Sequence, residues 1–376
     1  VGRCRKGEGE RIFNRQNYRR DSFAFKIMHV LALSADRSNR GVLCGGSSAF
    51  KRQEAYAKQF GNLDIIVFSL MSDGSENIDA GPLRIFPTNS WFKILWGIDA
   101  FRIVNKLPRP DIVTVQDPFE TGLAGLLIAQ RLGVPLHVQV HTDFLSPEYA
   151  KLSLLNRMRV CVAGFVLRRA ARVRVVSERV GSSIKRKYDI AAPVTVLPIF
   201  VDIAKFRDAK MPAKPFTAKK YSYQVLIVAR SAAEKNIKFA EDAFEKSAPP
   251  DARLIVCGDI SEEDIRNKQS DRIYYVSTDD PASLYKAVDL VLVPSKYEGY
   301  GLVIVEALAA GKPVLSTDVG IAREAGAIIT TEEKFADALS EWFKNGPRTG
   351  ELKNYPYKNL DGYIQAYCDD ILAVAG

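Results

Sequence analysis

Short apolar runs that suit strands alternate with helix-compatible stretches along this chain, and the alternation occurs twice. In the first half, helices are expected at Ser48–Phe60 and Gly122–Leu132. Continuous apolar strands joined by helices predict a parallel sheet covered on both faces, as in a doubly wound α/β domain. The expected strands of this half are Phe25–Ser34, Asp64–Leu70, Asp111–Val115, Leu136–Val140 and Arg172–Val176.

The segment Asp202–Tyr223 interrupts this pattern because it is rich in Lys, Pro and Ala and has no clear period, which is typical of a linker. The alternation then restarts, and 376 residues suit two domains better than one core. We therefore expect a basic tail over 1–24, a first α/β domain over 25–202, a linker over 203–223 and a second α/β domain over 224–355. The strands of the second domain are expected at Gln224–Ala229, Arg253–Cys257, Ile273–Val276, Leu290–Pro294 and Pro313–Ser316.

The segment Asn89–Lys106 carries apolar side chains at helical spacing, including Trp91, Leu95, Ile98 and Phe101. A stripe of this kind is more often a core face than a ligand site, so we expect these residues to be buried.

Composition predicts a cytoplasmic protein. No uncharged run approaches the roughly 18 residues of a spanning helix, and the N-terminus is charged, so we expect neither a membrane span nor a signal peptide. The five cysteines are scattered and never spaced C-x-x-C, which favours a reducing compartment and argues against a structural zinc site.

The formal net charge of +9 is concentrated between Lys151 and Lys187, where eleven basic residues accompany one acid, Glu178. Apolar residues such as Leu154 and Phe165 are interleaved with them. One interpretation is the solvated face of ordinary helices. A second is a surface that docks on anionic lipid or an anionic acceptor, where each basic group contributes ~1 kcal/mol. Nucleic acid is the least favoured partner, because no nucleic-acid-binding motif accompanies the charge.

The densest functional signal is the stretch Pro294–Gly320, in which Glu298 and Glu306 stand eight residues apart. Glu298 is expected in a strand-to-helix loop and Glu306 on the helix that follows. Gly299 and Gly301 let the backbone approach a ligand, and the helix N-terminus offers free N–H groups to an anion such as a diphosphate. Carboxylates repel phosphate, so these two better suit the hydroxyl groups of a sugar or ribose.

Other expected strand ends also carry functional candidates. Arg230 and Lys235 follow the first strand of the second domain, where a guanidinium fork and an ammonium group suit phosphate oxygens. His141 follows a strand of the first domain, and Gly45 and Gly46 follow its first strand as a plain turn or a loop that faces a cleft. Since ligands of open parallel sheets lie beyond the carboxyl ends of strands, we expect the site in an interdomain cleft.

Several common motifs are absent from the sequence. The dinucleotide fingerprint fails because Ile304 stands where its third glycine belongs, and the phosphate-binding loop motif fails because Pro313 follows Gly311-Lys312. No Asp-x-Asp occurs, so we expect neither metal ligands nor a cofactor.

At these residues the sequence resembles the family 4 retaining glycosyltransferases of the GT-B fold, in which two Rossmann-like domains face each other across a cleft. The resemblance runs from about Phe25 to the C-terminus. Its strongest part is the E-x7-E motif, present as Glu298 to Glu306, and Arg230 and Lys235 match the family's R-x4-K.

The resemblance implies how the donor is held. Arg230 and Lys235, with the backbone of Gly301 and Leu302, would bind the diphosphate of a nucleoside diphosphate sugar, and Glu306 would bind its ribose. The nucleotide sugar would be a substrate, with no metal needed.

Further implied roles concern the transferred sugar. His141, within HTDF, matches the family's strand-end histidine, and Gly45-Gly46 matches its N-terminal glycine loop. Glu298 and His141 would be the catalytic residues that contact the donor sugar, while the glycine loop would lie near the phosphates and acceptor. In this fold the final helix commonly crosses back to the first domain, which we expect of residues 356–376.

We therefore expect a glycosyltransferase that moves a hexose, with retention, to a lipid, polysaccharide or small-molecule acceptor. An anionic membrane surface is a further expected partner, which would place the protein at the inner face of the membrane. Other functions stay open: a GT-B epimerase or phosphorylase, or a sugar-nucleotide binder without catalysis. Gly320-Ile321 stands where the family usually has two glycines, which bears on donor specificity.

Overall fold

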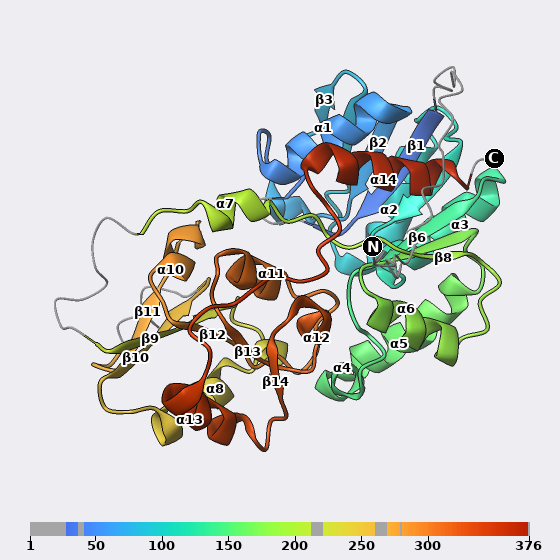
Figure 1. Cartoon of the computed structure of the whole chain (residues 1–376). Helices are drawn as coiled ribbons and strands as arrows, with labels where there is room; N and C mark the ends of the chain where they lie inside the picture. Colours follow the sequence, from blue (N-terminus) through green and yellow to red (C-terminus); the bar gives the residue numbers. More distant parts are fainter. Residues whose placement is uncertain (1–27, 37–40, 212–220, 260–268, 279, 375–376) are drawn as a thin grey trace, which may run out of the picture.

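The computed structural model describes residues 28–36, 41–211, 221–259, 269–278 and 280–374. Within these residues the chain forms two α/β domains, each built on its own sheet (Figure 1). The doubly wound architecture predicted from the sequence is confirmed. The basic tail expected over 1–24 lies outside the described residues, as do positions 212–220 of the expected linker.

The N-terminal domain contains an eight-stranded sheet in the order β3-β4-β2-β1-β5-β6-β7-β8. Its described strand pairs are parallel apart from the antiparallel pair β3–β4, a short edge addition that the sequence patterns did not reveal. The strands are β1 Met28–Ser34, β2 Gly61–Val67, β3 Ile78–Ala80, β4 Leu83–Pro87, β5 Ile112–Val115, β6 Leu136–Val140, β7 Arg172–Val175 and β8 Val194–Val196.

Helices cover both faces of this sheet. One core layer lies beneath α1, and the other lies beneath α3, α5 and α6. The helices are α1 Ser48–Phe60, α2 Trp96–Val104, α3 Glu120–Leu132, α4 Pro147–Leu152, α5 Leu154–Leu167 and α6 Glu178–Lys187, and the 3₁₀ turns are η1 Met71–Asp73 and η2 Lys93–Leu95.

The C-terminal domain contains a six-stranded parallel sheet in the order β11-β10-β9-β12-β13-β14. Its strands are β9 Tyr223–Val228, β10 Ala252–Cys257, β11 Ile273–Val276, β12 Leu290–Val293, β13 Val314–Thr317 and β14 Ile328–Thr330. Its helical segments are α7 Ile203–Arg207, η3 Ala233–Lys235, α8 Ile237–Ser247, α10 Ala282–Lys286, α11 Leu302–Ala309, α12 Ala322–Ala325 and α13 Phe335–Asn345.

The first residues of the expected linker belong to the core of the C-terminal domain. Asp202 caps α7 by accepting a hydrogen bond from the Lys205 amide, and α7 packs against α10 and α11. The Phe206 ring is buried there and meets the Tyr285 ring edge-on. The chain is therefore anchored before it reaches the undescribed part of the linker.

The last described helix, α14 Leu360–Leu372, lies on the N-terminal domain beside α1, drawn in red across the blue helix in Figure 1. Asp370 accepts a hydrogen bond of 2.6 Å from Arg172 and lies 3.0 Å from His137 Nε2. Burial by itself raises the pKa of Asp370, but the bonds from His137 and Arg172 outweigh it and hold that pKa at about 2. A buried charged group thus fastens the chain's end to the first sheet.

The expectation that Asn89–Lys106 forms a buried aromatic stripe is wrong for two of its members. Trp91 and Ile98 are 71% and 52% exposed, whereas Leu95 and Phe101 are partly buried. Trp91 precedes the helical segments, which begin at Lys93, and Ile98 lies on the side of α2 that faces solvent. Separately, no helix in the described part of the chain is both long enough and apolar enough to cross a membrane.

Candidate active site

A cleft of about 880 Å³ lies between the two domains, and both contribute to its walls. Five of the residues singled out in the sequence line it: His141 from the first domain, and Arg230, Lys235, Glu298 and Gly299 from the second. The full lining is Ala35, Lys93, Ile94, Trp96, Asp117, Phe119, Glu120, His141, Thr142, Tyr149, Leu155, Arg159, Arg230, Glu234, Lys235, Tyr297, Glu298 and Gly299.

The two domains meet where the loop after β12 reaches the end of β6. A Cβ atom added to Gly299 would lie 1.9 Å from the His141 carbonyl oxygen, so only glycine fits this approach. Ser177 Oγ donates a hydrogen bond of 2.8 Å to the Gly299 carbonyl, and Arg179 forms an ion pair with Asp318. These contacts bring the Glu298 loop directly against His141.

Lys235 and Glu298 form an ion pair at the cleft wall. Lys235 ends η3 after β9, and its Nζ lies 2.5 Å from Glu298 Oε1. The same carboxylate oxygen accepts a hydrogen bond of 2.8 Å from Ser295 Oγ. Both charged side chains are mostly buried, so water screens this pair less than a surface pair.

Arg230 lies at the more open side of the cleft. Its guanidinium donates a 2.8 Å hydrogen bond to Glu234, and its side chain is 68% exposed. An exposed pair of this kind contributes little to stability, so Arg230 is free to exchange its carboxylate partner for a bound anion at small cost.

His141 belongs to a polar network under the cleft floor. Its Nε2 lies 3.3 Å from Gln139 Oε1, which also accepts a hydrogen bond of 2.7 Å from Arg174 Nη1. Burial, followed by the nearby Arg174 charge, lowers the pKa of His141 to about 3, so the imidazole is neutral at pH 7. Because Gln139 Oε1 is the acceptor, Nε2 donates and Nδ1 retains its lone pair.

Helix α14 supports this network from behind. Arg174 is fully buried and donates to the Tyr363 hydroxyl, and Gln139 Nε2 donates a 2.9 Å bond to the Tyr367 hydroxyl. The Arg174 guanidinium also lies 5.0 Å from the centre of the Tyr367 ring, within cation–π distance. The end of the chain therefore fixes the side chain that positions His141.

Glu306, Gly301 and Leu302 do not line the cavity itself. Gly301 adopts a φ of +96° as the cap of α11, and Leu302 is the first residue of that helix. Glu306 lies one turn further on, where it accepts a 2.7 Å hydrogen bond from the Tyr285 hydroxyl. Burial raises the pKa of Glu306, and the Tyr285 bond offsets part of that shift.

The glycine pair at 45–46 also lies outside the cavity lining. Gly45 and Gly46 are exposed in the turn before α1, and an added Cβ on either would meet no atom within 4 Å. Gly46 has a φ of +82°, which a glycine adopts without strain. The plain-turn interpretation accounts for this geometry.

Sequence reasoning missed Asp117 among the cleft residues. It follows β5, and its carboxylate accepts a 2.7 Å hydrogen bond from the Phe119 amide. Burial raises its pKa, while hydrogen bonds from Thr121 and the Phe119 amide oppose the rise. The signal was available, since Asp117 stands just beyond an expected strand, as His141 does.

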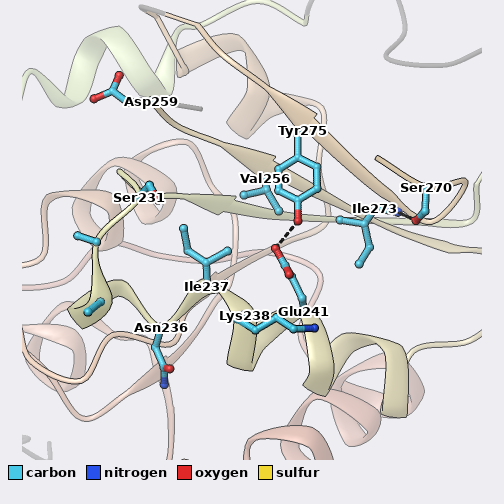
Figure 2. A pocket seen from close by; sticks show the side chains of 12 residues that line it. Ser231, Asn236, Ile237, Lys238, Glu241, Val256, Asp259, Ser270, Ile273 and Tyr275 are labelled. Carbon is cyan, nitrogen blue, oxygen red and sulfur yellow. Dashed lines mark hydrogen bonds between the residues drawn. The ribbon is translucent and has the colours of Figure 1, made fainter. Parts of the chain in front are cut away.

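A second cavity of about 800 Å³ lies within the C-terminal domain and shares no lining residue with the cleft (Figure 2). Figure 2 shows Tyr275 from β11 pointing at Glu241 from α8, to which its hydroxyl donates a 2.6 Å bond. Asp259 and Ser270 border this cavity and flank residues that the structure does not describe. We assign it no role.

Two α/β domains that face each other across a shared cleft have the arrangement of the GT-B fold. Two family models match the chain: "Glycosyltransferase Family 4" over residues 55–205 and "Glycosyl transferases group 1" over residues 212–359. The chain belongs to the family 4 glycosyltransferases of the GT-B fold, as its sequence motifs predicted.

Curated relatives share this family. A D-inositol 3-phosphate glycosyltransferase of Segniliparus rotundus is 32% identical over 225 residues, covering 53% of this chain and 49% of the relative. An alpha-monoglucosyldiacylglycerol synthase of Streptococcus pneumoniae is 27% identical over 228 residues, covering 55% and 51%. The chain thus spans about half the length of these relatives.

Solved structures share the fold over nearly the whole chain. Sucrose-phosphate synthase from Thermosynechococcus elongatus superposes with a TM-score of 0.67 at 18% identity, covering 92% of this chain and 96% of that one. The Anabaena protein HepE, in complex with UDP and glucose, superposes with a TM-score of 0.64 at 19% identity, covering 93% and 97%.

Proposed function

We propose that this chain transfers a hexose from a nucleoside diphosphate sugar to an acceptor hydroxyl and retains the anomeric configuration. The observation that carries the proposal is the Lys235–Glu298 pair in the interdomain cleft, where Gly299 touches the His141 backbone. A cation for the diphosphate and hydrogen-bonding groups for the sugar thus converge on one space.

Each cation of the cleft already binds the oxygen atoms of a carboxylate, and phosphate oxygens are ligands of the same kind. Arg230 is paired with Glu234 and Lys235 with Glu298. An incoming diphosphate replaces those partners and brings more negative charge than a single carboxylate does. As the bond from sugar to diphosphate breaks, negative charge builds on the leaving oxygen, and Arg230 and Lys235 stabilise that charge.

The sugar is held from both domains, by Glu298 of the second and His141 of the first. Once Lys235 turns to the phosphates, the Glu298 carboxylate is available to accept hydrogen bonds from sugar hydroxyls. The neutral His141 adds a hydrogen-bonding group that carries no charge to compete with the cations. Both residues orient the anomeric carbon toward the acceptor.

Transfer then follows a front-face substitution. The acceptor oxygen bonds to the anomeric carbon on the side from which the diphosphate departs. The bond from that carbon to the diphosphate breaks, and the acceptor proton passes to the leaving diphosphate oxygen. Attack and departure on one face retain the configuration. No cofactor enters this scheme, because the nucleotide sugar is itself the activated substrate.

Similar proteins support the choice of substrates. The Anabaena neighbour is described in complex with UDP and glucose, so a uridine donor is the first to test. The names of the relatives point to an inositol phosphate acceptor in one case and a diacylglycerol glycolipid product in another. We infer that the acceptor presents a hydroxyl on a polar group, free or attached to lipid.

A transfer assay with NMR detection tests this function. The protein is incubated with UDP-glucose, GDP-mannose or ADP-glucose and an extract of candidate acceptors, and the anomeric signals are followed. We expect a new α-linked product from one α-linked donor and a much slower reaction with Lys235→Ala. Isomerisation of the donor without an acceptor, or cleavage that needs phosphate, would instead indicate an epimerase or a phosphorylase. Binding without turnover would indicate a non-catalytic protein.

A further inference from the structure

One face of the N-terminal domain exposes large apolar side chains beside the cleft. Trp91, Phe92 and Ile94, at and just before η2, are 71%, 67% and 87% exposed, and Ile98 continues this surface along α2. Scattered apolar residues are normal on protein surfaces, but four within eight positions are not scattered. Two of these residues, Trp91 and Ile98, were expected in the core from the sequence pattern.

Helix α5 extends the exposed surface. Leu154, Met158 and Phe165 are exposed and fall four and seven residues apart, so they share one side of the helix. Helix α3 contacts both α2 and α5 and exposes Leu123 and Leu127 between them. We call the exposed apolar side chains of residues 91–98, α3 and α5 the apolar face.

Unneutralised cations border the apolar face. Arg157, Arg168 and Arg169 on and after α5 are exposed, and no carboxylate pairs with them within the described ranges of the chain. The Arg169 guanidinium lies 3.9 Å from the centre of the Phe165 ring. Apolar groups flanked by cations match the boundary between acyl chains and anionic headgroups.

We propose that the apolar face docks on an anionic lipid bilayer. This inference goes beyond sugar transfer and does not depend on it. Ile94 and Leu155 belong to this surface and also line the cleft, so a bilayer here holds the mouth of the cleft at the level of the lipid headgroups. The charge complementarity favours a membrane over a neutral protein partner.

Vesicle flotation without any nucleotide tests the proposal. We expect the full chain to float with phosphatidylcholine vesicles that contain phosphatidylglycerol at low salt, and to bind pure phosphatidylcholine vesicles much more weakly. Replacing the three arginines together (R157Q, R168Q, R169Q) should weaken binding on the order of 100-fold, since each cation near an anionic membrane is worth roughly fivefold. Trp91→Ser with Phe92→Ser should weaken binding to both vesicle types.

A matched control removes the same charge elsewhere. Lys246, Lys334 and Lys344 are exposed on and beside α8 and α13 of the C-terminal domain, and their replacement by Gln should leave flotation unchanged. An equal loss in this control, or a wild-type chain that ignores vesicle charge, overturns the proposal. A second result would also overturn it: the chain binds no vesicles but self-associates in light scattering, and Trp91→Ser abolishes the self-association. A second copy of the chain would then be what covers the apolar face.

Titration of each variant with UDP, GDP and ADP separates this proposal from the proposed function. Retained binding of the nucleotide that the wild-type chain prefers shows that a variant is folded and that lost flotation is a surface effect. A wild-type chain that floats but binds none of the three nucleotides would contradict the transferase proposal and leave the docking proposal intact.

Discussion

The two domains share one architecture but present different chemistry at the carboxyl ends of their strands. The N-terminal sheet ends in His141, a neutral imidazole fixed by Gln139 and Arg174. The C-terminal sheet ends in charged pairs, Arg230 with Glu234 and Lys235 with Glu298. The histidine at one strand end is neutral and held by a buried network, whereas the strand ends of the other domain carry ion pairs that can exchange partners.

This difference assigns the parts of a donor to the two domains. A diphosphate carries charge and requires cations that release their present partners, which the C-terminal loops provide. A sugar carries hydroxyl groups and requires fixed hydrogen-bonding positions, which a locked histidine provides. The close contact between Gly299 and the His141 backbone brings the charged pairs and the histidine into one site. A substitution that disrupts this contact is therefore the strongest test.

Gly299→Ala should have the largest effect. The new Cβ collides with the His141 carbonyl and pushes the domains apart. A displacement of about 1 Å costs on the order of 100-fold in kcat, while UDP binding by the C-terminal loops should change little. Gly97→Ala is the matched control, because its nearest contact would be 3.9 Å away. Unchanged kcat in steady-state assays would show that the close contact is not needed.

Lys235→Ala should weaken nucleotide binding, because it removes a cation proposed to bind the diphosphate. Loss of a charge-assisted hydrogen bond costs about 1.5–3 kcal/mol, so nucleotide affinity should fall roughly 10- to 100-fold. Lys238→Ala, three residues on, removes an exposed cation that is paired with Asp242 and should leave the affinity unchanged. Equal affinities for the two variants would remove Lys235 from the site.

Gln139→Leu should disrupt the buried hydrogen-bond network that holds His141. It leaves buried Arg174 and His141 without a shared acceptor, so the free energy of unfolding should fall by about 1–3 kcal/mol in urea titrations. Gln130→Leu on the exposed side of α3 serves as the control. A fall in kcat with little change in nucleotide affinity would mark Gln139 as a positioning residue, and identical stability of both variants would contradict the network.

Acid should destabilise the fold through the buried His141, by little just below pH 6.5 and by more at lower pH. The pKa of His141 is about 3 when folded and 6.5 in the unfolded reference, so the unfolded chain binds the extra proton. Its contribution to stability is complete above pH 6.5 and is lost as the pH falls toward 3, with a slope of at most about 1.4 kcal/mol per pH unit. His137 is shifted in the same direction. Denaturant titrations of His141→Phe should therefore show a shallower loss below pH 6.5, and an unaltered slope would mean that His141 titrates normally.

Much of the fold was predictable because its signals are local. The helix expected at Ser48–Phe60 has those bounds in the structure, since Ser47 caps its start through the Phe50 amide and Gly61 ends it. The edge pair β3–β4 was missed because both strands are short and β4 contains Arg84 and Pro87. Ile98 was misplaced because a pattern cannot show whether another element covers a helix, and Trp91 because the helical segments begin only after it.

The candidate site was predictable only in part for a similar reason. Placing His141, Lys235 and Glu298 at strand ends required nothing more than the strand pattern. The close approach that only Gly299 permits depends on how two domains meet, and the Gln139–Arg174 support depends on α14 returning from the far end of the chain. These are tertiary contacts that no local motif encodes.

A calorimetric titration tests most directly whether Lys235 binds the diphosphate and His141 the sugar. UDP, GDP and ADP, and then the sugar nucleotide of the base that binds, are titrated into the wild-type chain, Lys235→Ala and His141→Ala. We expect the free nucleotide to lose affinity only with Lys235→Ala, and the sugar nucleotide to lose affinity with both variants. Binding of none of the three nucleotides, or equal losses of free nucleotide affinity in both variants, would contradict a site in which Lys235 holds the diphosphate and His141 contacts only the sugar.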